Sequence, residues 1–263
     1  MKANVFDLKG KSAGKVELPK FFGQPVRTDL IQRSSLAIQS TLRQPYGSDP
    51  MAGKRTSAHY HGKRRERHTM MNVDMARMAR IHTGSPHMRY RARRVPQSVK
   101  GRRAHPPKPI KKWVQKINRK ENLLAIKSAI IATSSSDYVK KRGHVVNGME
   151  LPLVVKDDIH SIKKTSDAKE MLIKFGLEKE LNRTKRKKVR SGKGKRRGRK
   201  YKRKVGPLIV ISEDKGILKA ARNIPGVDVK LVGALTIKDL APGGKAGRLT
   251  IYSQSAMKKL EEF

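Results

Sequence analysis

The sequence contains no cysteine, which excludes disulfide bonds, thiolate catalysis and cysteine-based zinc sites. Its longest apolar runs, at 208–211 and 129–132, are far below the roughly 18 residues that a membrane-spanning helix requires. The first residues also lack the apolar run of a signal peptide. We therefore expect a soluble, intracellular chain with no membrane partner.

Aromatic residues are scarce, with one Trp, five Phe and six Tyr among 263 residues. So few rings argue against a surface that stacks splayed single-stranded bases. Apolar residues make up 36% of the chain, below the roughly 45–50% of ordinary globular proteins. Part of the chain can therefore build a core, and part cannot.

Acidic residues are also few: 21 Asp and Glu face 63 Lys and Arg, a formal net charge of +42. Residues 54–112 contain 18 Lys or Arg against two acids, and residues 183–204 contain 15 against none. Such a chain repels itself unless a polyanion supplies counter-charge, and neutralising phosphates drives nucleic-acid binding. A solvated face or a disordered tail is the weaker alternative, because both stretches lie inside the chain.

Short apolar strands alternate with helices after residue 118, which predicts an α/β domain whose parallel sheet is covered on both faces. An N-terminal hairpin at 5–18 precedes a helix capped by Thr28 and ended by Pro45. We expect strands at 151–155, 208–212, 227–232 and 249–252. We expect one helix that begins at Asn118 and another that runs from Ser136 or Asp137 to Gly143. Further helices are expected at 166–175, through residue 181, at 214–222, at 236–240 and after Ser253.

The helix that follows Asn118 carries two local signals. Asn118 with Glu121 predicts a capping box. Its apolar residues predict one buried stripe formed by Leu123, Leu124, Ile126, Ile130 and Ile131.

Residues 46–112 show almost no periodicity and contain six of the eight histidines. A loop of this length is usually functional or disordered. A short helix after Asn72 could place Met71, Met75 and Met78 on one face, as apolar filler more readily than as a specific binding face, and would order only against a partner. We thus divide the chain into 1–45 (hairpin and first helix), 46–112 (extended basic loop) and 113–263 (the rest of the domain, with a basic insertion at 183–204).

Two glycine-rich segments resemble phosphate-binding loops only superficially. Gly192, Gly194 and Gly198 miss the dinucleotide spacing by one residue, and we expect no strand before them and a flexible basic arm around them. The segment 242–247 precedes a strand and lacks the Lys-Ser/Thr ending of a P-loop. We expect no nucleotide and no other cofactor.

His59 and His61, with His68 nearby, could suggest a metal site. No acid or thiolate accompanies them, and the surrounding Arg and Lys disfavour a cation, so we expect contacts with RNA and no metal. The pairs Asp157-Asp158 and Glu213-Asp214 lie at strand–helix junctions, where capping is the simpler role. No serine–histidine–aspartate or paired-carboxylate pattern predicts an enzyme.

Residues 91–108 read RARRVPQSVKGRRAHPPK. This segment resembles the basic loop of the large-ribosomal-subunit protein four family, in its archaeal branch. Further matches run in order along the chain: YGSD at 46–49, AG at 52–53, RT at 55–56, GRKY at 198–201, AARN at 220–223 and DLAPGG at 239–244. Residues 61–84 match only loosely, and the sequence ends at Phe263, without the C-terminal extension of eukaryotic members.

The resemblance implies a three-layer α/β/α domain on the surface of the cytoplasmic ribosome, bound to 23S-type ribosomal RNA early in assembly beside other large-subunit proteins. It also implies that the long loop enters the RNA and that its tip lines the nascent-peptide exit tunnel. The tip is expected within 77–91, at Arg77, Arg80, Gly84, Ser85, Pro86, His87, Met88 and Arg89.

Arginines can bridge phosphates with a fixed fork, while lysines act as point charges. The expected RNA contacts are Arg55, Arg64, Arg65, Arg91, Arg93, Arg94, Lys100, Arg102, Arg103, Lys108, Arg196, Arg197, Arg199 and Lys200. Two other hypotheses stay open: a nucleotide-dependent enzyme with an RNA substrate, and a chromatin-like general nucleic-acid-binding protein. Neither is favoured. An enzyme would need a phosphate loop or a carboxylate site, and the sequence has no such pattern. DNA binding usually employs groove-reading helices or terminal arms, whereas the basic stretches here are internal loops.

Overall fold

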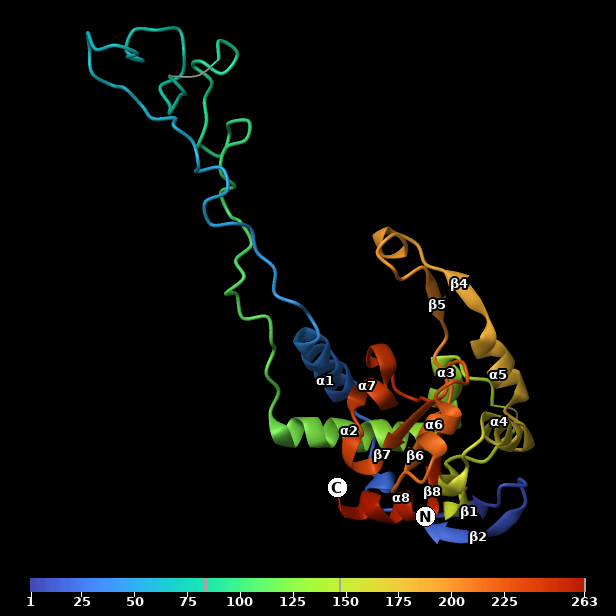
Figure 1. The fold of residues 1–263 in the computed structure, drawn as a ribbon. Coiled ribbons are helices and arrows are strands. Elements are labelled where there is room, and N and C mark those ends of the chain that lie inside the picture. Colours follow the sequence, from blue (N-terminus) through green and yellow to red (C-terminus); the bar gives the residue numbers. More distant parts are fainter. Residues whose placement is uncertain (83–84, 147, 263) are drawn as a thin grey trace. The chain divides into compact units, whose positions relative to one another are not determined.

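The computed structural model describes residues 1–82, 85–146 and 148–262 (Figure 1). The chain divides into two compact units. One unit joins Met1–Leu42 to Val114–Phe263, and the other is Arg43–Trp113.

The first unit is built on a six-stranded sheet with the order β2-β1-β3-β8-β6-β7. Neighbouring strands are parallel except β1 and β2, which form the predicted N-terminal hairpin. The strands are β1 (Lys2–Phe6), β2 (Ser12–Glu17), β3 (Leu153–Val155), β6 (Leu208–Ile211), β7 (Asp228–Leu231) and β8 (Thr250–Ser253).

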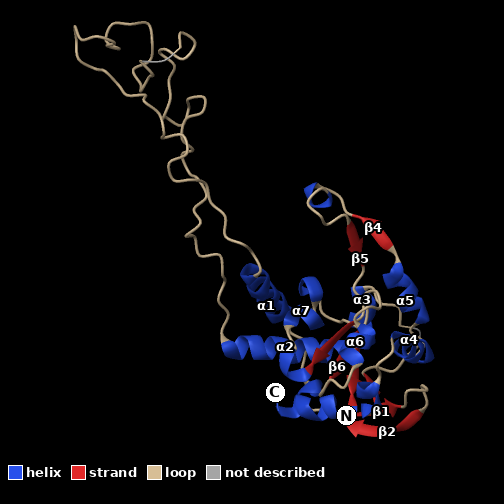
Figure 2. Cartoon of the chain, viewed as in Figure 1, coloured by secondary structure: helices blue, strands red, loops and turns tan. Residues whose placement is uncertain are grey.

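Eight helices of the described residues accompany this sheet (Figure 2). They are α1 (Thr28–Thr41), α2 (Arg119–Ser134), α3 (Ser136–Arg142), α4 (Thr165–Lys174), α5 (Glu178–Lys185), α6 (Ile217–Ala221), α7 (Ile237–Leu240) and α8 (Gln254–Lys259). Residues of α1, α2, α7 and α8 pack in one apolar cluster, and residues of α3, α4, α5 and α6 pack in another.

The two clusters lie on opposite faces of the sheet. In β6, Leu208 and Val210 join the first cluster, whereas Ile209 and Ile211 join the second. This division follows from the period of two in a strand, and it explains why a strand buried on both faces is apolar at every position. The predicted α/β fold, with helices on both faces of a mainly parallel sheet, is confirmed.

Two predicted helix ends hold at the level of individual contacts. Gly143 ends α3 with φ +96°, a conformation that glycine adopts without a Cβ penalty. The Ser253 hydroxyl accepts a hydrogen bond from the Ala256 backbone N–H (3.1 Å) and so caps α8.

The predicted start of α1 is wrong by one residue. Thr28 is already helical, and the preceding Arg27 donates its backbone N–H to the Ser128 hydroxyl of α2 at 2.5 Å. The start of α1 is thus tied to α2 by a bond between helices, which no local sequence signal reports.

The predictions for α2 are partly wrong. Asn118 occupies the cap position without a side-chain bond, while Glu121 pairs with Arg33 of α1 at 3.2 Å. Leu123 and Leu124 are 38% and 49% exposed, although Ile126, Ile130 and Ile131 are buried. The most deeply buried residues include three small ones at 125, 129 and 132. An apolar pattern does not show which side of a helix approaches its neighbour most closely.

The flexible arm expected around Gly192, Gly194 and Gly198 is instead part of an antiparallel hairpin that follows α5. Its strands are β4 (Lys187–Val189) and β5 (Tyr201–Arg203), so a strand does precede Gly192. Arg190 N–H continues the pairing to the Lys200 carbonyl (2.8 Å). The strands were missed because their side chains are all exposed, which leaves no apolar alternation to detect.

The second unit contains only isolated bridges and turns among its described residues. Arg80 pairs with both His59 and Ala92, and Ser48 N–H donates to the Pro107 carbonyl (3.0 Å). No helix directly follows Asn72 among the described residues, since that residue has φ +56° and turns follow it; a helix that orders only against a partner stays a prediction. The stretch has too few apolar neighbours to hold a helix of nine residues.

Candidate nucleic-acid interface

A positively charged groove lies where the hairpin β4–β5 leaves the first unit. Its volume is about 550 Å³. We call it the basic groove; it is lined by Arg142, Gly143, His144, Arg183, Arg186, Lys187, Lys188, Lys202, Arg203, Lys204 and Val205. Eight of these side chains are Lys or Arg and none is acidic, so the groove suits a polyanion.

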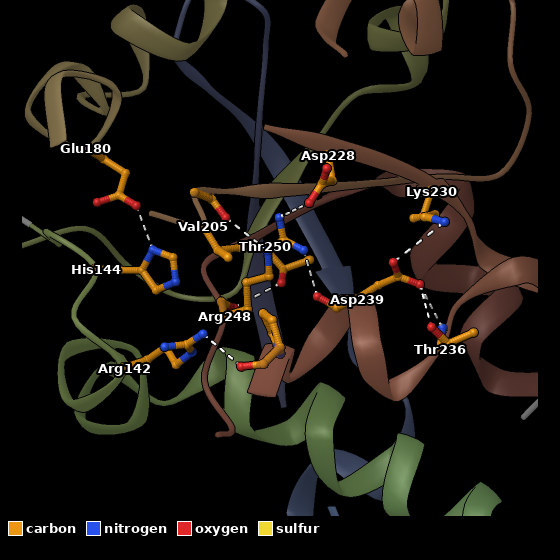
Figure 3. Close-up of polar contacts among 12 residues, drawn as sticks. Arg142, His144, Glu180, Val205, Asp228, Lys230, Thr236, Asp239, Arg248 and Thr250 are labelled. Carbon is orange, nitrogen blue, oxygen red and sulfur yellow. Dashed lines mark hydrogen bonds and ion pairs between the residues drawn. The ribbon is translucent and has the colours of Figure 1, made fainter. Parts of the chain in front are cut away.

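One buried carboxylate organises the wall of the basic groove. Glu180 of α5 accepts a hydrogen bond from His144 Nδ1 at 2.6 Å (Figure 3). It also accepts hydrogen bonds from Arg183 Nε (2.7 Å) and from the Val145 backbone N–H (3.1 Å). Burial alone would raise the pKa of Glu180, but the bonds from Arg183 and His144 lower it to about 2. Glu180 therefore remains charged and holds both donors in place.

The same network fixes the base of the hairpin. Arg183 Nη2 donates to the Val205 carbonyl at 2.6 Å, just beyond the end of β5. Arg183 thus joins α5, which leads into β4, to the segment that returns from β5. The basic hairpin is thereby attached to a buried ion pair although its own side chains are exposed.

Arg142 lies beside this network with its positive charge incompletely neutralised. Its Nη2 donates to the Pro242 carbonyl (2.8 Å), whereas its buried Nε has no hydrogen-bond partner among the described residues. Burial lowers the pKa of Arg142, and the nearby cations Arg248 and Arg183 lower it further. An anion in the basic groove would relieve this repulsion.

Arg248 holds together the strands behind the basic groove. It is 1% exposed and donates from Nε to Gly206 O (2.9 Å), from Nη1 to Asp239 O (2.8 Å) and from Nη2 to Asp228 Oδ2 (2.5 Å) (Figure 3). Asp239 also forms a capping box with Thr236 at the start of α7. Arg248 serves the fold, since all three of its nitrogens are already bonded.

The predicted RNA-binding residues of the hairpin lie at its outer end. Arg196, Arg197, Arg199 and Lys200 are all exposed and lie between β4 and β5. They project no side chain into the core, so their charge is available to solvent or to RNA. Sequence reasoning named these four residues but overlooked the basic groove at the hairpin's base, because Arg142 is distant from the basic run in sequence.

Most predicted RNA contacts of the second unit are also exposed. These are Arg55, Arg64, Arg65, Arg91, Arg94, Lys100, Arg103 and Lys108, while Arg102 is half-buried. Arg55 pairs with Asp49. Arg93 differs, since it is 8% exposed and its Nη1 donates to the Val99 carbonyl (2.6 Å). This bond links two parts of the loop, and RNA binding by Arg93 stays a prediction.

The predicted tip residues do not form one uniform surface. Arg77, Ser85, Pro86, His87 and Arg89 are exposed, and Gly84 lies outside the described residues. Arg80 is turned inward and donates to the Tyr90 carbonyl (2.8 Å) and the Ala76 carbonyl (2.9 Å). Met88 is half-buried, with its sulfur 3.9 Å from Arg93 Nη2.

A small interior gives the second unit local order. Ala58, Met70, Ile81 and His82 are buried. His82 lies with His59 and His61, and one ring nitrogen from each of the three falls within 4.8 Å of the others. The sequence pattern indicated His59, His61 and His68 as a possible metal site and did not indicate His82. His82 is more than 20 residues from the other two along the chain, so no local pattern reveals their contact.

Sequence comparison decides the family. The model of the ribosomal protein L4/L1 family matches residues 16–263. The chain belongs to the ribosomal protein L4/L1 family. Large ribosomal subunit protein uL4 of Nanoarchaeum equitans is 44% identical over 265 residues, covering 100% of this chain and 98% of that protein. The proteins of the same name from Methanopyrus kandleri and Sulfurisphaera tokodaii are 44% and 45% identical, covering 100% and 99% of the chain and 98% and 94% of their own lengths.

Membership of the L4/L1 family confirms the predicted resemblance and its archaeal branch. The chain is a structural ribosomal protein of the cytoplasmic ribosome and not an enzyme. Of the helices in the described parts of the chain, none combines the length and apolarity that crossing a membrane would require.

Proposed function

We propose that this L4/L1-family protein binds 23S-type ribosomal RNA in the large subunit through two separate basic elements. One is the basic groove with its hairpin, and the other is the long loop 46–112. The basic groove is the observation that carries the proposal: eight cations surround it, no acid lines it, and a buried ion pair fixes its wall. Neighbouring large-subunit proteins are the further partners that we propose, and early assembly is the proposed time of binding.

Groove and loop supply different kinds of contact. The groove presents a preformed wall, so binding there requires little ordering of the chain. The loop presents many exposed arginines on a backbone with little internal structure, so RNA must supply much of its order. Arginine forks can bridge phosphates at fixed angles and would hold the loop along its length.

The test is the salt dependence of RNA affinity. The full chain should bind large-subunit ribosomal RNA with a log–log slope of roughly −0.7 to −0.9 per phosphate contact. Changing Lys187, Lys188, Lys202 and Arg203 to Gln should flatten the slope by about three units. The matched control changes four exposed lysines of the N-terminal region, Lys9, Lys11, Lys15 and Lys20, to Gln. Equal slopes for the two variants would contradict the groove as an RNA site.

General nucleic-acid binding is the alternative function. If it were correct, duplex DNA would compete with ribosomal RNA equally at each salt concentration. Our proposal expects the chain to remain with large subunits after a high-salt wash and DNA to compete poorly.

We further propose that the tip of the long loop lines the exit tunnel and contacts the nascent peptide. Its support is the family resemblance together with the exposed Ser85, Pro86, His87 and Arg89. Deleting residues 81–88 would also remove the buried Ile81 and His82, so a probe at an exposed position is the sharper test. A photoreactive residue at His87 should crosslink to a stalled nascent peptide, whereas one at Lys169 of α4 should not. Absence of a crosslink from His87 would place the tip elsewhere.

A further inference from the structure

We propose that His59, His61 and His82 form a binding site for one zinc ion at the end of the long loop. The ring centroids are 4.2 Å apart for His59 and His61, 4.4 Å for His61 and His82, and 4.8 Å for His59 and His82. The three imidazoles thus meet at one point, although His82 is more than 20 residues from the others in sequence. None of the three histidines lines the basic groove.

Two backbone carbonyls determine which nitrogens can bind a metal. His59 Nδ1 is 2.9 Å from the Ser57 carbonyl, and His82 Nε2 is 3.2 Å from the His59 carbonyl. A carbonyl only accepts, so each of these nitrogens carries the proton. The opposite nitrogens, His59 Nε2 and His82 Nδ1, are then lone-pair donors. Metal-binding histidines commonly have this arrangement, with the second ring nitrogen donating to a carbonyl.

His82 Nδ1 provides an independent indication of a missing ligand. His82 is 7% exposed, and its buried Nδ1 has no hydrogen-bond partner among the described residues. A buried polar atom without a partner costs free energy, so such an atom requires an explanation. Coordination of an ion by the Nδ1 lone pair would supply that partner.

The third ligand is His61, whose Nε2 lies against His59 Nε2. A direct bond requires one of these nitrogens to keep a proton, whereas coordination uses both lone pairs. One metal-ligand nitrogen from each residue lies within 4.8 Å of the other two. Ligands held about 2.0–2.1 Å from a tetrahedral zinc ion are about 3.3 Å apart, which small ring rotations would reach.

Neutral imidazoles are the form that binds metals, and three of them with one water make a known type of zinc coordination. The two carbonyl contacts leave His59 and His82 with one lone-pair nitrogen each, as such a site requires.

The positive charge of the arginines around the cluster disfavours a bound cation. The backbone of Arg80 passes beside the three histidines, but its guanidinium donates to the carbonyls of Ala76 and Tyr90. Those carbonyl dipoles offset part of its charge.

The experiment uses cobalt(II) as a spectroscopic substitute for zinc, with the full untagged chain alone and bound to large-subunit ribosomal RNA. We expect one equivalent to give the strong visible absorption of tetrahedral coordination, and zinc to displace it. His61→Gln and His82→Gln should each weaken binding at least about tenfold. His105→Gln, an exposed histidine in the same loop, should bind as the unchanged chain does.

A second readout separates ligand loss from misfolding. Zinc should slow proteolysis within residues 59–90 of the unchanged chain and leave the His82→Gln chain unprotected, because metal binding is coupled to local folding. Unfolding of the first unit should be the same in both. The proposal is overturned if no tetrahedral spectrum appears with or without RNA, or if His105→Gln and His82→Gln behave alike. A His59–His61 hydrogen bond without metal is then the correct description.

Discussion

Arg183 and Glu180, three residues apart on α5, form a two-point ion pair: Nε donates to Oε2 at 2.7 Å and Nη2 to Oε1 at 2.5 Å. Glu180 is fully buried, while the Arg183 side chain is 16% exposed toward the basic groove. The pair therefore connects the interior of the domain to the surface that we propose for RNA. Breaking it should affect both stability and binding.

Glu180→Gln should lower the free energy of unfolding by about 3 kcal/mol, because removing one partner leaves the other buried charge uncompensated. Urea titration followed by far-UV circular dichroism measures this change. Glu170→Gln is the control, since the Glu170 carboxylate is exposed and lies 4.0 Å from Lys174 Nζ. This substitution should lower the free energy of unfolding by less than about 1 kcal/mol. Equal losses in the two variants would show that the buried pair contributes nothing special.

The same carboxylate should make stability depend on pH in the acid range. Folding lowers the pKa of Glu180 from near 4.5 to about 2. Its stabilising contribution is thus complete above pH 4.5 and is lost as the pH falls toward 2. The difference in unfolding free energy between the unchanged chain and Glu180→Gln, about 3 kcal/mol at neutral pH, should shrink across this window. A difference that stays constant down to pH 2.5 would contradict the assigned pKa.

Arg248→Met should be the most damaging single change in the sheet region. It removes donors from the carbonyls of Gly206 and Asp239 and from the carboxylate of Asp228. We expect a loss of about 3–5 kcal/mol in unfolding free energy. Lys230→Met, which removes only a partly exposed pair to Asp239 at 3.6 Å, should cost about 1 kcal/mol or less. Urea unfolding of the two variants in one buffer measures both losses. Equal losses would show that Arg248 is dispensable for stability.

Changing Arg196, Arg197, Arg199 and Lys200 to Ala should weaken RNA binding and leave the fold intact. All four are exposed at the outer end of the hairpin, and surface substitutions of this kind usually change stability by less than about 0.5 kcal/mol each. Thermal unfolding of the free protein and RNA affinity at two salt concentrations measure the two effects. A large fall in melting temperature would show that the hairpin end stabilises the domain.

Gly53→Ala should impair the loop without affecting the first unit. Gly53 has φ +74°, and a Cβ there would lie 2.5 Å from the Gly101 carbonyl carbon. The backbone must move to admit the Cβ, and the cost of that movement adds to the roughly 1–2 kcal/mol that a left-handed conformation costs a residue other than glycine. RNA affinity should fall about tenfold at unchanged unfolding free energy of the domain. Gly148→Ala, with φ +65° and open space around the added Cβ, should leave RNA affinity unchanged.

Local signals predicted the elements of the first unit well where packing and sequence agree. The apolar run 208–211 is the buried strand β6, and Gly143 and Ser253 end and begin helices as expected. These signals succeed because burial on two faces, a left-handed C-cap and a hydroxyl N-cap each depend on residues close in sequence. Between α1 and α2 the described residues form no named helix or strand, as the lack of apolar periodicity there indicates.

Contacts between distant residues could not be predicted from the sequence. The strands of the basic hairpin have no buried side chain, so no apolar pattern in the sequence indicates that β4 pairs with β5. Arg93 and Arg80 resemble RNA-binding arginines in sequence but donate to loop carbonyls. Asn72 resembled a helix cap, yet it adopts a left-handed conformation. A charge has the same sequence signature whether it faces solvent or a carbonyl.

The sequence by itself determined the charge, the α/β pattern and the two basic stretches, because each of these is a property of composition or of neighbouring residues. Only the tertiary structure decided which cations share the basic groove, which carboxylate holds its wall, and which three histidines meet. Arg142 and Lys202, or His59 and His82, come together through chain reversals whose geometry depends on packing throughout the unit. Such proximity is a property of the folded chain and has no local signal in the sequence.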